Sequence, residues 1–326
     1  RFDSLMSTPR IFIRRESRQS QWSSGGFNAV QRATVGRERP GVVRFVGGRD
    51  RRQATRIATV PNRTKGVHVH DHHAMPGLLA EFLRRHRDDV ESIEVIEYEP
   101  MAGGYSRSMA RARIRYTNDG VSLEESVVLR GDPPPGHSMI ETDRDHEWAV
   151  LEMLTELGVI PIPAARYYDG TGEHLGTKAI VMDHVTGGSL QSLIEEMADY
   201  GDHPTRLARL WGQIHTITPD QLPDAMPRPE SWDARIDELI ATWRHYESVS
   251  VNSNPTWRYI AAWLEANKPP PLPLRLTHGD PQAPNVMVDH HDNYLVVDWE
   301  FAAIGDPRED LGWYNIYSTA AGPNLY

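Results

Sequence analysis

The chain has 326 residues, of which 39% are hydrophobic and 25% are charged, and its formal net charge is −10. This composition is typical of a globular protein and excludes collagen-like and wholly disordered classes. Without any cysteine the chain cannot form a disulfide, a Cys-ligated zinc site or a thiol nucleophile. No apolar run approaches the roughly 20 residues that span a bilayer, and no signal-peptide pattern is present. We therefore expect a cytoplasmic protein with no membrane partner.

The charge changes sign along the chain. Residues 1–75 carry 15 Lys and Arg against 5 Asp and Glu, a balance of +10, whereas the other 251 residues carry 20 against 40, a balance of −20. The basic segment has no sustained helical or strand period, so residues 1–75 are predicted to be a disordered or non-native extension. A basic tail can also bind nucleic acid, but no aromatic-plus-basic module accompanies this one. We therefore expect no nucleic-acid partner.

Four histidines lie at the end of the basic segment: His68, His70, His72 and His73. In a strand, alternate positions share one face, so three of these histidines could hold a metal ion. Nothing nearby in the sequence supplies groups that would orient such ligands. The interpretation that we favour is a polar linker.

Residues 76–185 are predicted to be a first lobe, a small antiparallel sheet with one inserted helix. The triplet Asn118-Asp119-Gly120 is a strong hairpin-turn signal between two strands. The inserted helix is expected to start near Thr142, where a polar residue precedes acidic ones. The periodicity predicts helices over 76–89 and 143–157 and strands over 93–98, 109–116, 126–131 and 177–185.

Residues 186–326 are predicted to be a second, mainly helical lobe. Apolar residues recur at helical spacing in three segments, and a proline run after Lys268 ends the last of them. A hairpin with a polar connection follows. The predicted helices cover 204–217, 232–246 and 255–266, and the hairpin strands cover 285–288 and 294–299.

The most informative stretch is LTHGDPQAPNVMVDHHDNYLVVDWEFAAIGDPREDLGWY, residues 276–314. It places Asp280 on a loop, Asn285 five residues later, and Asp298 at the end of the hairpin. Phosphoryl transfer from a nucleotide needs one carboxylate for the attacking hydroxyl and oxygen ligands for magnesium. Each residue alone has an ordinary interpretation as a turn or surface residue. The three together favour phosphoryl transfer.

This stretch resembles the aminoglycoside phosphotransferase and choline kinase superfamily, and more narrowly the phosphotransferase domains fused to acyl-CoA dehydrogenases. The resemblance rests on HGDPQAPN and VVDWEFAAIGDPREDLGW and extends from about Leu78 to Tyr317. It implies an α+β, two-lobed protein-kinase-like fold with a small antiparallel β N-lobe and a mainly helical C-lobe. It also implies an enzyme that uses ATP and Mg²⁺ to phosphorylate a hydroxyl of a small molecule.

The resemblance assigns roles to the three motif residues. Asp280 is expected to be the catalytic base, and Asn285 and Asp298 are expected to be the magnesium ligands. Among their neighbours, His278 is expected to be a structural loop residue, and Glu300 is expected either to help orient the metal site or to have no part in it. His215 is expected to be a packed core histidine, and Asp306 and Asp310 are expected to cap and anchor the next helix.

The first lobe is expected to bind the nucleotide at three places. Similar proteins have a flexible loop over the phosphates where this chain has Gly103, Gly104 and Ser106, a pattern that also suits an ordinary hairpin turn. On the third strand Arg130 replaces the family's lysine, with Glu147 as its helix partner. The alternative for Arg130 is a surface residue on an edge strand. The hinge that would bind adenine contains Met182, Asp183 and Val185.

The acceptor and the oligomeric state are not predicted by these patterns. The chain ends at Tyr326, only 16 residues (326 − 310) beyond Asp310, whereas similar proteins continue through several more helices. The resemblance therefore implies a truncated product or an unusually small C-lobe. Arg130 and this short end also favour an alternative, a non-catalytic nucleotide-binding protein like a pseudokinase. A nucleic-acid-associated protein that acts through the basic tail is a third alternative.

Overall fold

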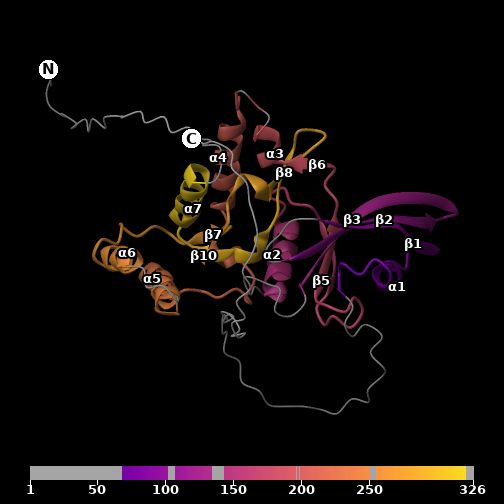
Figure 1. The fold of residues 1–326 in the computed structure, drawn as a ribbon, viewed down its shortest axis with the longest axis horizontal. Coiled ribbons are helices and arrows are strands. Elements are labelled where there is room, and N and C mark those ends of the chain that lie inside the picture. The colour runs from indigo at the N-terminus through magenta and orange to yellow at the C-terminus, as the bar shows by residue number, and fades with distance from the viewer. Residues whose placement is uncertain are drawn as a thin grey trace, which may run out of the picture. The chain divides into compact units, whose positions relative to one another are not determined.

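The computed structural model describes residues 68–101, 107–133, 143–195, 197, 199–249 and 255–320 (Figure 1). All of these residues belong to one compact unit. The predicted extension up to residue 67, the phosphate-loop residues Gly103, Gly104 and Ser106, and Thr142 lie outside the described residues.

The first lobe is built on a five-stranded antiparallel sheet in the order β1-β2-β3-β5-β4. The four predicted strands are confirmed, and the predicted turn at Asp119 and Gly120 has the positive φ angles that a tight hairpin needs. The edge strand β4 was not predicted, because its five residues have no alternating pattern. The strands are β1 (Ser92–Met101), β2 (Ser108–Asn118), β3 (Val121–Gly131), β4 (Ala165–Asp169) and β5 (Ala179–Asp183).

The two faces of this sheet are covered by different helices, α1 (Met75–His86) and α2 (Arg144–Leu157). Successive side chains of a strand point to opposite faces. On β3, Val127 and Leu129 pack with the buried residues of α1, whereas Val128 packs with those of α2. Arg130 lies two residues after Val128, on the same face of the sheet, and contacts Glu147 of α2. The strand period therefore directs a charged side chain toward the inserted helix.

The inserted helix α2 has defined ends. Asp143 caps its start, and its carboxylate accepts a hydrogen bond from Asp145 N at 2.9 Å. Gly158 ends the helix with φ 61° and donates to Leu154 O at 3.0 Å. The sequence placed this start near Thr142, but the residue that caps the helix is Asp143. The carboxylate is a competent cap for the same reason as a hydroxyl, because its oxygen accepts from exposed N–H groups.

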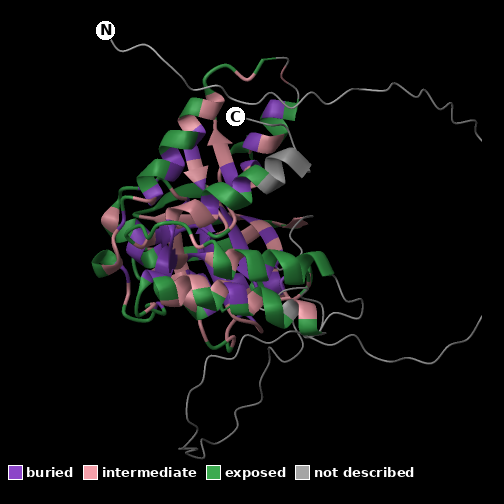
Figure 2. Cartoon of the chain, turned by 90° about the vertical axis from the view of Figure 1, so that its left-hand side faces the viewer, coloured by how far each residue is buried: buried purple, intermediate pink, exposed green. Residues whose placement is uncertain are grey.

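The second lobe is mainly helical, as predicted, and encloses two small antiparallel sheets. Trp211 and Trp299 are its largest fully buried side chains, and they belong to one core with residues of α2 and β5. Figure 2 shows buried and exposed residues alternating along the helices. The helices are α3 (Leu190–Glu195), α4 (His203–Ile214), α5 (Trp232–Val249), α6 (Pro255–Ala266) and α7 (Pro307–Ala320). The strands are β6 (Gly187–Ser189), β7 (Arg275–Thr277), β8 (Val286–Asp289), β9 (Tyr294–Val296) and β10 (Ala303–Gly305).

The segment before α1 packs against the first lobe. Val69 is fully buried, and Tyr98 Oη donates to its carbonyl oxygen at 2.5 Å. Asp71 accepts hydrogen bonds from the backbone N–H groups of His73 and Ala74, which lower the pKa of its carboxyl. In the part of the chain that the structure describes, no three His, Cys, Asp or Glu side chains gather as a metal-binding group. None of the described helices is long and apolar enough to cross a bilayer.

Candidate active site

The loop after β7 carries His278, Gly279 and Asp280. His278 is fully buried, and its Nε2 lies 3.0 Å from Val297 O, to which it donates. Its Nδ1 accepts from Asp280 N at 3.2 Å. Both ring nitrogens thus bond the backbone, as expected for a structural loop residue, and they fix the path of the chain before Asp280.

Gly279 is required by the geometry of this loop. Its φ of +83° lies in the left-handed region, which residues with a side chain rarely adopt. A Cβ at this position would lie 2.4 Å from the carbonyl oxygen of Phe301. The backbone of the loop therefore approaches the segment after β9 more closely than any side chain allows.

Two carboxylates at the start of α7 make different contacts. Asp306 caps the helix, because it accepts from Arg308 N at 2.9 Å, and it also accepts from Trp232 Nε1 at 2.6 Å. Asp310 was expected to anchor its own helix as well, but it bonds the loop after β7 instead. Its oxygens lie 2.9 Å from the backbone N atoms of His278 and Gly279.

His215 lies beside this contact, with its Nε2 at 2.9 Å from Asp310 Oδ2. The sequence predicted a packed core histidine, and the ring is half-buried between α4 and α7. Its hydrogen bond makes it a partner of the carboxylate that holds the loop. Such a contact joins residues 95 apart and leaves no local pattern.

The Asp280 carboxylate is half-buried and accepts hydrogen bonds on both oxygens. Gln282 Nε2 and Asn285 Nδ2 lie 2.6 Å and 2.8 Å from its Oδ2. Trp313 Nε1, from α7, lies 2.6 Å from its Oδ1. Three donors therefore orient the carboxylate, and the sequence pointed to neither Gln282 nor Trp313.

Asn285 and Asp298 are the predicted metal ligands. Asn285 is 7% exposed and donates with Nδ2 to both the backbone and the side chain of Asp280. Within the described residues no hydrogen bond reaches its Oδ1, so this amide presents an oxygen of the kind that Mg²⁺ prefers. Asp298 follows β9 in the left-handed conformation, with φ 70°. Val297 N donates to Asn285 O at 2.9 Å, which ties the two segments together.

Arg130 joins the two lobes. Its Nε lies 3.0 Å from Glu147 Oε1, and its Nη2 forms an ion pair with Asp298 and lies 3.6 Å from Glu300 Oε2. Arg130 is only 6% exposed and lies on a central strand, so the alternative of a surface arginine on an edge strand is wrong. Burial lowers the pKa of this guanidinium, but Glu147 and Asp298 outweigh burial and raise it.

The charge of Arg130 also acts on Asp298. Burial raises the pKa of this carboxyl, but the positive charge of Arg130 outweighs it, and the pKa lies below its ordinary value. Asp298 is therefore ionised at neutral pH, as a metal ligand must be.

Two further buried arginines surround this pair, and the sequence pointed to neither. Arg107 lies 2.5 Å from Glu300 through its Nη2, and burial, together with the nearby positive charge of Arg144, lowers the pKa of its guanidinium. Arg144 pairs with Glu147 and with Asp132, the latter at 3.0 Å. Arg144 precedes Glu147 by one helical turn, a spacing that could have indicated the pair.

These arginines and their carboxylate partners form one cluster of opposite charges, which we call the arginine cluster; its arginines and glutamates are buried, and its two aspartates are partly exposed. Three guanidiniums face four carboxylates, so the formal charges of the cluster sum to −1, three positive against four negative. Its members are Arg107, Arg130, Arg144, Asp132, Glu147, Asp298 and Glu300.

The predicted hinge lies between β5 and β6. Met182 is 8% exposed and belongs to the core, and the Asp183 carboxylate pairs with Arg166 at 2.5 Å. The N–H groups of Asp183 and His184 already bond Ala164 O and Ser126 O. Val185 N makes no backbone hydrogen bond within the described residues. Among the expected adenine-binding groups, the Val185 N–H is therefore the available donor.

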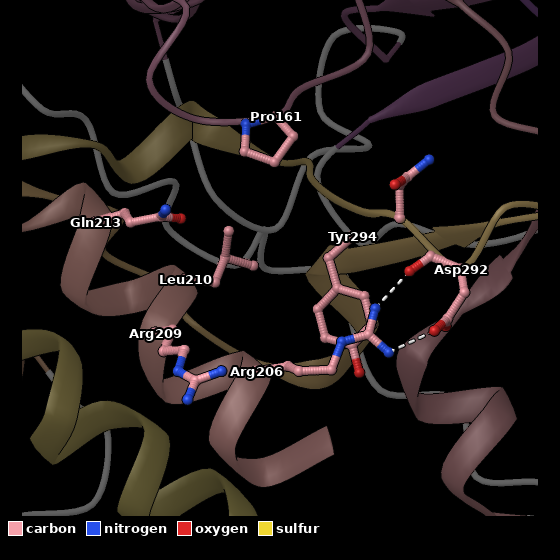
Figure 3. Close-up of a pocket in the computed structure, with 8 residues that line it drawn as sticks. Pro161, Arg206, Arg209, Leu210, Gln213, Asp292 and Tyr294 are labelled. Carbon is pink, nitrogen blue, oxygen red and sulfur yellow. Dashed lines mark hydrogen bonds and ion pairs between the residues drawn. The ribbon is translucent and has the colours of Figure 1, made fainter. Parts of the chain in front are cut away.

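A surface cavity of about 340 Å³, lined mainly by residues of the second lobe, lies elsewhere (Figure 3). Arg206 covers the ring of Tyr294, with its guanidinium carbon 4.1 Å from the ring centre, and its Nη1 bonds Asp292 at 2.7 Å. None of the predicted site residues lines this cavity. Its lining residues are Pro161, Arg206, Arg209, Leu210, Gln213, Asp292, Asn293 and Tyr294.

Comparison with known proteins places this geometry in a family. The sequence pattern of the phosphotransferase enzyme family matches residues 97–326. The chain belongs to that family. The family supports the predicted kinase-type transferase and the two-lobed α+β fold that the structure contains.

Among curated relatives, acyl-CoA dehydrogenase family member 11 of Homo sapiens is 26% identical over 261 residues, which are 73% of this chain and 32% of that protein. The Pongo abelii protein of the same name is 24% identical over the same shares. The chain thus matches about a third of the length of these relatives.

Two solved structures show the same fold. One is a thermostable mutant of aminoglycoside phosphotransferase APH(4)-Ia in a ternary complex with ADP and hygromycin B, with TM-score 0.53, 17% identity and coverage of 74% of this chain and 77% of the other. The other is macrolide 2'-phosphotransferase type I, with TM-score 0.50, 16% identity and coverage of 76% and 83%.

Proposed function

We propose that this member of the phosphotransferase family transfers the γ-phosphate of ATP to a hydroxyl of a small molecule, in a reaction that depends on Mg²⁺. The observation that carries the proposal is the pair of contacts that Arg130 makes, with Glu147 of α2 on one side and with Asp298 on the other. A buried cation that links a strand, a helix and a candidate metal ligand suits the binding of a metal–polyphosphate.

Asp280 is proposed as the catalytic base. Its carboxylate would accept the proton of the acceptor hydroxyl while the hydroxyl oxygen attacks the γ-phosphorus. The hydrogen bonds from Gln282, Asn285 and Trp313 hold this carboxylate in one orientation. Orientation is a large part of catalysis in phosphoryl transfer, because the reaction needs little covalent chemistry from the protein.

Asn285 and Asp298 are proposed to hold Mg²⁺ through an amide oxygen and a carboxylate oxygen. This donor set fits a hard cation that keeps several waters and binds few protein ligands. When bound, the ion would neutralise charge on the phosphates. For Asp298 to reach it, the Arg130 guanidinium would shift toward Glu300, whose Oε2 is 3.6 Å away.

The nucleotide would lie between the lobes. Arg130 and Glu147 are proposed to position the α- and β-phosphates, with Gly103, Gly104 and Ser106 above them. Met182, Asp183 and Val185 would form the adenine end, where the Val185 N–H supplies the hydrogen bond. The two solved structures of this fold are an aminoglycoside phosphotransferase and a macrolide 2'-phosphotransferase, which supports a small-molecule acceptor for this chain.

The direct test is ADP release from purified protein with MgATP and a panel of aminoglycosides, macrolides, choline, homoserine and hydroxyacyl compounds. One acceptor is expected to give turnover, and Asp280→Asn is expected to lower kcat by about 10³-fold while the Kd for MgADP stays within about twofold. Asp224→Asn is the matched control, because Asp224 is fully exposed. Unchanged turnover in Asp280→Asn would exclude this residue as the base.

A second candidate function is nucleotide binding without catalysis. The observation that favours it is the arginine at position 130, where similar proteins carry lysine, because a guanidinium and an ammonium bind phosphate with different geometry. If no acceptor yields ADP although MgADP raises the melting temperature, the kinase proposal fails and the binding function stands.

A further inference from the structure

Two side chains of helix α7 contact the loop that follows β7. Asp310 accepts hydrogen bonds from the backbone of His278 and Gly279. Trp313 follows three residues later, a spacing that places both side chains on the same face of the helix. Its indole Nε1 lies 2.6 Å from Asp280 Oδ1. The helix that fixes the loop backbone therefore also contacts the carboxylate that the loop presents.

The hydrogen bonds to Asp280 are distributed unevenly. Its Oδ2 accepts two, from Gln282 at 2.6 Å and from Asn285 at 2.8 Å. Within the described part of the chain, its Oδ1 accepts one, from Trp313. An ionised carboxylate has about four acceptor positions, roughly two on each oxygen. The position that an incoming hydroxyl can use is therefore on Oδ1, beside the indole.

Trp313 remains 42% exposed although its N–H is bonded. An aromatic ring at that exposure next to a carboxylate offers a flat apolar surface to whatever approaches the carboxylate. Three other tryptophans of α5 and α6 are similarly exposed, but Trp313 is the one whose indole bonds Asp280. Those three are Trp243, Trp257 and Trp263.

We propose that Trp313 is a positioning residue for Asp280 and a wall of the acceptor site, a role that rests on the proposed phosphotransferase function. The indole N–H holds Oδ1, and the ring packs on the carbon skeleton beside the reacting hydroxyl. The acceptor is accordingly an alcohol with a C–H face next to its hydroxyl, such as a sugar ring or an alkyl chain. In the reaction the O–H proton passes to Asp280 Oδ1, the oxygen bonds the γ-phosphorus, and ADP leaves.

Two substitutions separate the two contributions of this side chain. Trp313→Phe keeps a ring and removes the N–H, so kcat is expected to fall about 10- to 100-fold with the acceptor KM within about twofold. Trp313→Ala removes both, and the acceptor KM is expected to rise about tenfold as well. The Kd for MgADP is expected to stay unchanged in both variants. Trp263→Phe is the matched control, since Trp263 is 50% exposed on α6, and it is expected to retain wild-type kinetics.

Wild-type kcat in Trp313→Phe, an equal loss in Trp263→Phe, or a loss that follows the Kd for MgADP would overturn the proposal. A second measurement does not need turnover. The Trp313 indole N–H signal in a ¹H–¹⁵N spectrum, identified by its absence in Trp313→Phe, is expected to shift in Asp280→Ala. If it does not shift, the positioning role is wrong. If the wild type phosphorylates no acceptor, the proposed function fails, whereas this signal still decides whether the indole holds Asp280.

Discussion

Arg130 Nε lies 3.0 Å from Glu147 Oε1, and both side chains are buried. The contact joins the central strand β3 to the helix α2 at the point where the first lobe meets Asp298. It is therefore both a structural link and part of the proposed nucleotide site.

Replacement of Arg130 by alanine should affect stability and binding together. The buried carboxylates of Glu147 and Glu300 would then lose a neighbouring positive charge. This loss is expected to lower the free energy of unfolding by about 3 kcal/mol, as measured by urea denaturation. Arg111→Ala is the matched control. That arginine is 40% exposed on β2 and pairs with Glu99, so its loss is expected to cost less than about 1 kcal/mol. Equal losses in the two variants would contradict the buried role of Arg130.

Replacement of Asp298 by alanine should weaken the binding of the magnesium–nucleotide complex. Asp298→Ala is expected to raise the Kd for MgADP at least tenfold, because a proposed ligand of the ion is lost. The Kd for metal-free ADP is expected to stay the same or fall, since Arg130 is released toward the phosphates. Titration calorimetry with and without Mg²⁺ measures both constants, and Asp224→Ala provides the control. A variant that retains the wild-type response to Mg²⁺ would show that Asp298 is not a ligand.

Substitution of Gly279 should disrupt the loop that carries Asp280. In Gly279→Ala the new Cβ would meet Phe301 O at 2.4 Å at a φ of +83°, so the loop has to move. The expected results are a fall of several degrees in melting temperature and the loss of most phosphotransferase activity. Gly212→Ala is the control, because Gly212 lies in α4 with no atom within 4 Å of the added carbon. That change is expected to be neutral or stabilising.

The carboxyl of Asp306 predicts a pH dependence of stability. Burial raises its pKa, but the hydrogen bonds from Arg308 and Trp232 outweigh burial and lower it. Because the native pKa lies below the unfolded value of about 3.9, the stabilisation is complete above that pH and disappears as the pH falls through the native pKa. The difference in unfolding free energy between wild type and Asp306→Asn is expected to be about 2 kcal/mol at neutral pH and to shrink below about pH 4. A difference that is constant with pH would contradict this explanation.

The sequence predicted the architecture well where local patterns were strong. The strands of β1 to β3, the helix α2 and the hairpin of β8 and β9 follow from periodicity and turn residues, and the fold was confirmed. The short strands β4, β6, β7 and β10 were missed, because three to five residues carry too little alternation to be distinguished from loops.

For the candidate site, the spacing around Asp280 indicated which residues the loop and hairpin would bring together. The partners that hold them were not visible, because they come from distant segments. Arg107 of the first lobe meets Glu300 of the second, and Trp313 meets Asp280 across 33 residues of the second lobe. Asp310 illustrates the same limit: helix position indicated a cap, whereas tertiary packing directs its carboxylate to the loop backbone.

Side chains alternate between the two faces of the sheet along β3, so the pairing of β3 with β2 decides which of them face α2. Leu129 and Arg130 are neighbours in the chain, yet one packs with α1 and the other reaches α2. A shift of one residue in this strand would place a guanidinium among the apolar side chains of α1 and a leucine beside Glu147. The tight turn at Asp119 and Gly120 sets the pairing of β2 with β3, so it determines from a distance which side chain faces the proposed nucleotide site.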